Sequence, residues 1–83
     1  MSRRLYIGNL PRSATEEELR SKFGRVGTVE SVIIATDANT GISKRFGFVE
    51  MGNAAEAKAA VTRLNMTQYD DATMSVSVAR TDQ

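Results

Sequence analysis

Hydrophobic and polar positions alternate with a period of two in several short segments of the chain. The clearest case is residues 74–79, where Met74, Val76 and Val78 are separated by small residues. Alternation of this kind is typical of a strand with one buried and one solvated face. Branched and aromatic residues concentrate in three further segments. We therefore expect four strands, at Leu5–Leu10, Val29–Thr36, Lys44–Met51 and Met74–Ala79.

Two other segments carry helix signals. The first begins with a Thr-x-x-Glu capping box at Thr15 and should end before Gly24, which predicts a helix over Glu16–Phe23. The second begins at Asn53, and its apolar residues recur at helical spacing: Ala57, Ala60, Val61 and Leu64. Between the second and third strands, residues 37–41 are dense in turn formers and predict a hairpin loop.

The resulting order is βαββαβ, which is typical of a ferredoxin-like α+β sandwich. Right-handed crossovers would place both helices on one face of a four-stranded antiparallel sheet. In this plan the strand order is 4-1-3-2, so the first and third strands are central neighbours. The opposite face of the sheet has no helix to cover it. We expect one domain over residues 1–83, with its core at about 3–81.

Composition excludes most catalytic and metal-binding chemistry. The 83 residues include no cysteine and no histidine, so disulfides, thiolate zinc sites and histidine-based acid/base catalysis are excluded. Glu16, Glu17 and Glu18 are consecutive and point in different directions around a helix, so they do not form a converging carboxylate pair. We expect no enzymatic activity, no metal and no cofactor. The absence of a long apolar segment argues against membrane insertion, and we expect a cytoplasmic protein.

Three aromatic residues are expected to stand together on the uncovered face. Period-two geometry places Phe46 and Phe48 on the same face of the third strand, beside Tyr6 on the first. Bases of single-stranded nucleic acid would cover these rings well, because each stack contributes about 1 to 3 kcal/mol. The formal net charge is only +1, but cations lie near the rings or near strand ends: Arg3, Arg4, Lys44, Arg45 and Arg80.

Two of these segments carry a family resemblance. LYIGNL (Leu5–Leu10) resembles the short ribonucleoprotein motif of the RNA-recognition motif family, and KRFGFVEM (Lys44–Met51) resembles the long one. The motifs occur in the right order, about 40 residues apart. The chain is similar to short single-domain bacterial RNA-binding proteins, and a domain excised from a longer protein would look much the same.

The resemblance implies roles for individual residues. Tyr6 and Phe46 would stack on or pack against nucleotides, and Phe48 would do the same or insert between sugars. Lys44 would contact phosphate, and Asn9 would hold either the following loop or a base. Strand position, rather than the resemblance, adds Arg4 on the face of Tyr6 and Arg80 near a strand end as further cationic contacts.

The sequence departs from the family pattern at two positions. Arg45 replaces the usual glycine, and it would either contact phosphate or extend its side chain along the strand end into water. Met51 replaces the usual last aromatic residue, at a position that should face the helices. Methionine fills cores readily, so this change should be harmless.

Two further residues lie outside the two motifs. Ile33 would lie on the open face if the second strand keeps its register, and would otherwise be buried. Tyr69, in the turn before the last strand, would anchor that turn through its ring.

The expected function is non-catalytic binding of single-stranded RNA, with single-stranded DNA as a further ligand, by a monomer. RNA chaperoning and post-transcriptional regulation are compatible roles. The alternative is a protein-interaction module on the same fold, since fold alone does not fix function. The intact aromatic set favours nucleic acid.

Overall fold

The computed structural model describes residues 3–79, and only the backbone of Ser43 within that range. Strands and helices follow each other in the expected order, with one short strand added before the last. The elements are β1 (Arg4–Gly8), α1 (Glu16–Gly24), β2 (Val29–Thr36), β3 (Ser43–Met51), α2 (Ala54–Leu64), β4 (Thr67–Tyr69) and β5 (Ala72–Val78).

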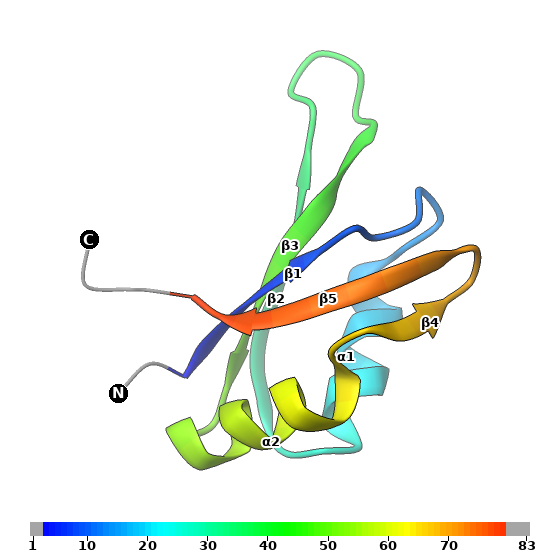
Figure 1. Cartoon of the computed structure of the whole chain (residues 1–83). Coiled ribbons are helices and arrows are strands. Elements are labelled where there is room, and N and C mark those ends of the chain that lie inside the picture. The colour runs from blue at the N-terminus through cyan, green and yellow to red at the C-terminus, as the bar shows by residue number, and fades with distance from the viewer. Residues whose placement is uncertain (1–2, 80–83) are drawn as a thin grey trace.

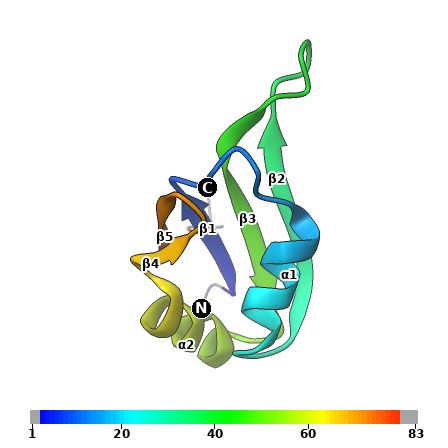
Figure 2. The ribbon, with the colours of Figure 1, turned by 90° about the vertical axis from the view of Figure 1, so that its right-hand side faces the viewer.

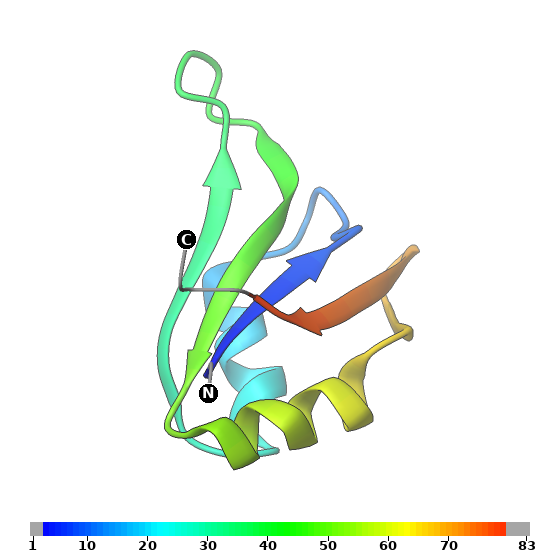
Figure 3. The same cartoon turned by 60° about the vertical axis from the view of Figure 1, so that its left-hand side comes forward.

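The strands form one antiparallel sheet in the order β2-β3-β1-β5-β4. Figure 3 shows β2, β3, β1 and β5 side by side. The central position of β1 and β3 is confirmed, and β5 takes the place predicted for the fourth strand. The prediction of four strands misses β4, which pairs with β5 from Thr67↔Met74 to Tyr69↔Ala72. A three-residue strand is too short to produce a visible alternation of polar and apolar residues.

Both predicted helix starts are confirmed by their caps. The Thr15 hydroxyl oxygen accepts the backbone N–H of Glu18 at 3.0 Å, and the Asn53 side-chain oxygen accepts that of Glu56 at 2.8 Å. Each bond satisfies one of the N–H groups that the first turn of a helix leaves without a partner. The starts of α1 and α2 therefore follow from local sequence. The predicted end of the first helix at Phe23 is one residue short, because α1 includes Gly24 and its C-cap is Arg25.

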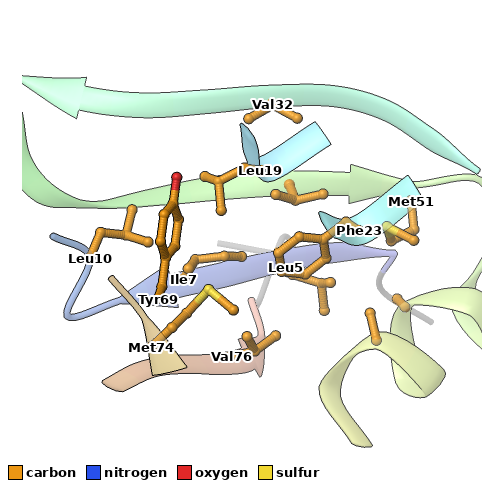
Figure 4. Close-up of a cluster of buried hydrophobic side chains, with 13 residues drawn as sticks. Leu5, Ile7, Leu10, Leu19, Phe23, Val32, Met51, Tyr69, Met74 and Val76 are labelled. Atoms are coloured by element: carbon orange, nitrogen blue, oxygen red, sulfur yellow. The ribbon is translucent and has the colours of Figure 1, made fainter. Parts of the chain in front are cut away.

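The core lies between the two helices and one face of the sheet (Figures 2 and 4). Strands β1, β3 and β5 contribute alternate residues to it, and each helix contributes two fully buried side chains. These residues are Leu5, Ile7, Val49, Met51, Met74, Val76, Leu19, Phe23, Ala57 and Ala60. Because the helices pack on one face only, the opposite face of β3, β1 and β5 is left open. The expected burial of Met51 is confirmed.

The β2–β3 loop extends beyond the body of the domain (Figure 1). One carboxylate oxygen of Asp37 accepts the backbone N–H groups of Asn39 and Thr40 at 2.8 and 3.1 Å. These bonds favour the ionised form and hold the pKa of Asp37 below its usual 3.8. The predicted turn at residues 37–41 thus has a specific hydrogen-bonded structure, completed by Gly41 at φ 75°.

Candidate nucleic-acid interface

The open face carries a cluster of three rings, here called the aromatic platform: Tyr6, Phe46 and Phe48. Tyr6 on β1 is paired directly with Phe48 on β3. The ring centroids of Tyr6 and Phe46 are 5.8 Å apart, and their ring planes are inclined by 30° in a stacked arrangement. The centroids of Tyr6 and Phe48 are 5.7 Å apart, and these two rings meet edge to face. Phe46 and Phe48 are 6.3 Å apart. The structure therefore brings together the three aromatic residues that the sequence singled out.

The alternation of side chains along β1 and β3 directs the platform rings to the open face. Leu5 and Ile7, the neighbours of Tyr6, are fully buried, and so is Val49 beside Phe48. The side chains between them must point away from the helices. Tyr6 remains 37% exposed. An apolar surface of this kind is costly to leave in water, which makes it a candidate for contact with a ligand.

Gly8 provides space for the platform, a role that sequence reasoning missed. A Cβ atom at Gly8 would lie 3.1 Å from Cε2 of Tyr6 and 3.0 Å from the hydroxyl oxygen of Ser75. A side chain at position 8 would therefore make the Tyr6 ring or the Ser75 hydroxyl shift by a few tenths of an ångström. A glycine two residues after a strand aromatic is the sequence signal that could have indicated this.

The platform is flanked by an apolar residue on one side and by small polar residues on the other. Ile33 on β2 is paired with Phe48 and is 53% exposed, so its expected place on the open face is confirmed. On the other side, Ser77 of β5 is paired with Tyr6 and Ser75 with Gly8. Across the sheet, the surface changes from apolar at β2 to hydroxyl-rich at β5.

Cations and one carboxylate border the platform near the start of β1. The guanidinium carbon of Arg4 lies 5.8 Å from the centroid of Phe48, within the range of a cation–π contact. Arg3 donates to the Met51 carbonyl at 3.0 Å and lies 3.6 Å from the carboxylate of Glu50. Glu50 itself is paired with Arg4. Positive charge at this end is thus partly offset.

Lys44 and Arg45 lie where the pairing of β2 and β3 is irregular. Ile34 pairs with Gly47 and Thr36 with Ser43, so three residues of β3 face one residue of β2. Simple alternation, which placed Lys44 on the face of Phe46, does not continue through this bulge. Lys44 is exposed.

Arg45 connects the bulge to the end of β1. Its backbone adopts a left-handed conformation, with φ 68°. Its Nε donates to the Leu10 carbonyl at 2.9 Å, and its own carbonyl accepts the Leu10 N–H at 2.9 Å. The Arg45 side chain is therefore hydrogen-bonded to the β1–α1 loop. The sequence left two placements open, a phosphate contact and a side chain extended into water, and this bond is a third.

Asn9 joins two strands at the end of β1. It also has a left-handed backbone, with φ 55°, and its amide nitrogen donates to the Thr73 carbonyl of β5 at 2.7 Å. This bond holds the end of β1 to β5, and the two roles expected for Asn9, at the following loop or at a base, stay predictions. Arg80, the remaining predicted site residue, lies outside the described residues.

Tyr69 and the acidic first turn of α1 form a separate cluster away from the platform. The Tyr69 ring is 2% exposed, its hydroxyl donates to the Glu18 carboxylate, and Nζ of Lys22 lies 4.5 Å from its centroid. Burial, and then the bond to Glu18, raises the pKa of Tyr69 to about 12. The expectation that Tyr69 anchors its segment is confirmed.

The described part of the chain contains no group of three or more potential metal-ligating carboxylates. Neither of its two helices is long and apolar enough to cross a membrane.

The sequence of this chain matches a family model and is similar to known RNA-binding proteins. The family model described as RNA recognition motif matches residues 5–75. RbpA of Nostoc sp., a candidate RNA-binding protein, is 38% identical over 76 residues, which cover 92% of this chain and 74% of RbpA. The chloroplastic RNA-binding protein CP33 of Arabidopsis thaliana is 46% identical over 74 residues, which cover 89% of this chain but 22% of CP33.

Solved structures of RNA-binding domains have the same fold as this chain. The chain superposes on Sex-lethal of Drosophila melanogaster, in its complex with RNA, with a TM-score of 0.93 and 26% identity. The match covers all of this chain and 50% of the Sex-lethal chain. The fold and the two motif-bearing strands are therefore common to this chain and to domains found in both short and long proteins.

Proposed function

Because the chain belongs to the RNA recognition motif family, a family of non-catalytic RNA-binding domains, we propose that it binds single-stranded RNA on the open face of its sheet. The observation that carries the proposal is the aromatic platform. Its three ring centroids lie within 6.3 Å of one another, on the face of the sheet that the helices do not cover. Unpaired bases can stack on such rings whatever their sequence.

The platform sets the size and strength of the interaction. Three rings accommodate about two to four nucleotides, and stacking supplies about 3 to 9 kcal/mol before the cost of ordering the strand. After that cost, affinity for a short RNA should be in the micromolar range. Ile33 would extend the apolar surface under a neighbouring base, because it lies beside Phe48.

Cations supply the phosphate contacts in this proposal. Arg4 and Lys44 are exposed beside or near the platform, Arg45 lies at its far end, and Arg80 follows β5. Neutralising about four or five phosphates of a single strand predicts a slope near −3 for log affinity against log salt. The protein would act as a monomer in the cytoplasm, as an RNA chaperone or a post-transcriptional regulator.

The proposal is tested by fluorescence anisotropy with a labelled single-stranded RNA pool at several salt concentrations. Wild type should bind with micromolar affinity and the stated slope. Removing one ring, as in Phe46→Ala, should weaken binding about 5- to 100-fold, because one stack is lost. Glu17→Ala, on α1, serves as the control and should bind as wild type. Equal binding by Phe46→Ala and wild type would exclude the platform as the binding surface.

A further inference from the structure

A hollow of about 470 Å³ lies beyond the end of β1. It is lined by Arg12, Ser13, Arg45, Asp70 and Asp71, from the β1–α1 loop, the β3 bulge and the β4–β5 turn. Arg45 directly precedes Phe46 of the platform in the sequence, which links one side of the hollow to the third strand of the binding face. Its volume is within the range of small-ligand pockets, roughly 300–1,000 Å³.

Hydrogen bonds fix part of the lining in place. Two bonds to Leu10 hold Arg45, at 2.9 Å through Nε and at 2.9 Å through its carbonyl. The Ser13 hydroxyl donates to one carboxylate oxygen of Asp70 at 2.7 Å. These bonds join the three segments that surround the hollow.

Two charged side chains that line the hollow make no polar interaction with the rest of the described chain. Within residues 3–79, the side chains of Arg12 and Asp71 have no hydrogen-bond or ion-pair partner. A carboxylate repels phosphate, so the hollow is poorly suited to bind the RNA backbone alone. A guanidinium and a carboxylate together are suited to a neutral group that offers both acceptors and donors.

Guanine meets this requirement better than the other bases. Its O6 and N7 accept two hydrogen bonds from one guanidinium, and its N1–H and N2–H groups can donate to both oxygens of one carboxylate. Adenine and uracil have neither of these paired arrangements, and cytosine has no pair of adjacent donor groups. Bases of single-stranded RNA are available for recognition on both of these edges.

We propose that the hollow is a guanine-selective subsite, in which Asp71 accepts from the N1–H and N2–H edge and Arg12 donates to O6 and N7. The guanine belongs to the nucleotide next to the one stacked on Phe46. This assignment rests on the proposed function, because it extends the same RNA strand beyond the platform.

The test measures base preference in wild type and in variants of the hollow. Labelled short oligouridines carry G, A, C or U at either the 5′ or the 3′ terminal position. For wild type, G at one end should tighten binding about tenfold over the other three bases. In Asp71→Asn and in Arg12→Gln this ratio should fall to below about twofold. Because the ratio is taken within each variant, a general effect of changed charge on affinity cancels.

Control variants separate the possible outcomes. Glu17→Gln on α1 and Arg25→Gln at its C-cap make the same charge changes and should keep the wild-type ratio. If wild type binds the oligouridine through Phe46 and Phe48 but shows no preference for G, the subsite is excluded and the proposed function stands. A preference that persists in both Asp71→Asn and Arg12→Gln also overturns the subsite. Failure of every probe to bind wild type contradicts the proposed function itself.

Discussion

Gly8 is the residue on which the geometry of Tyr6 depends most directly. In Gly8→Ala, the new methyl group would lie 3.1 Å from the Tyr6 ring and 3.0 Å from the Ser75 hydroxyl oxygen, so the ring must shift by a few tenths of an ångström. We expect RNA affinity to fall about 3- to 10-fold, a part of one stacking interaction. The free energy of unfolding should change by less than about 1 kcal/mol, because an exposed ring can move.

Titration of RNA into Gly8→Ala, monitored by anisotropy, checks this prediction. Gly24→Ala is the matched control, since a Cβ there has no neighbouring atom within 4 Å. Binding by Gly8→Ala as tight as wild type would show that the ring position observed here is not needed for the interaction.

Arg45 combines a left-handed backbone with a side-chain hydrogen bond, and two substitutions separate these features. Both Arg45→Ala and Arg45→Gly lose the bond to the Leu10 carbonyl. Only glycine also relieves the conformation at φ 68°. We therefore expect Arg45→Gly to exceed Arg45→Ala in unfolding free energy by about 1 kcal/mol, as measured by urea denaturation. If Arg45→Gly is the less stable of the two, the backbone at this position is not strained.

Tyr69 makes stability depend on pH in the alkaline range. Its pKa is about 12 in the folded protein against 10.0 for an ordinary tyrosine, so the folded state favours the neutral ring. The stabilisation is complete below pH 10 and is lost as pH rises from 10 to 12. The advantage of wild type over Tyr69→Phe in unfolding free energy should be constant below pH 10 and shrink above it. A difference that stays constant up to pH 12 would contradict the raised pKa.

Strand β2 is an edge strand whose outward polar groups are partly covered by α1. Glu16 accepts the N–H of Ile34 at 3.4 Å, and Arg20 donates to the carbonyl of Val29 at 3.3 Å. Unpaired edge groups invite pairing with another chain. We expect the double variant Glu16→Ala, Arg20→Ala to self-associate at concentrations where wild type does not.

Sedimentation velocity across a concentration series measures this association. The control is Glu17→Ala, Arg25→Ala, which removes the same charges from α1 and its C-cap. Identical sedimentation of the two double variants would mean that the α1 side chains do not protect the edge.

The secondary structure is largely encoded in local sequence, and its exceptions have local causes. Thr15 and Asn53 start both helices as predicted because their caps involve residues only three positions away. Strand β4 was missed because it depends on pairing with β5 rather than on its own pattern. The bulge at Arg45 was missed because its contacts are with Leu10, far away in the sequence.

At the scale of the molecule, the platform could be predicted because alternation and strand order fix it. Tyr6, Phe46 and Phe48 required only the period of a strand and the adjacency of β1 and β3. The hollow lined by Arg12, Arg45 and Asp71 could not be predicted, since three separate segments meet there. Surface charge is also a property of the whole fold. A formal net charge of +1 says little about a face whose cations lie apart from the acidic turn of α1.

The most direct test of RNA binding on the open face is an NMR titration of the isotope-labelled protein. A random single-stranded RNA pool and the matching DNA pool are added to wild type and to the double variant Phe46→Ala, Phe48→Ala. We expect amide shifts concentrated at Tyr6, Phe46, Phe48 and Lys44, larger for RNA than for DNA, and absent in the folded variant. Shifts that are absent in wild type, or that persist unchanged in the variant, would contradict an RNA-binding role for the aromatic platform.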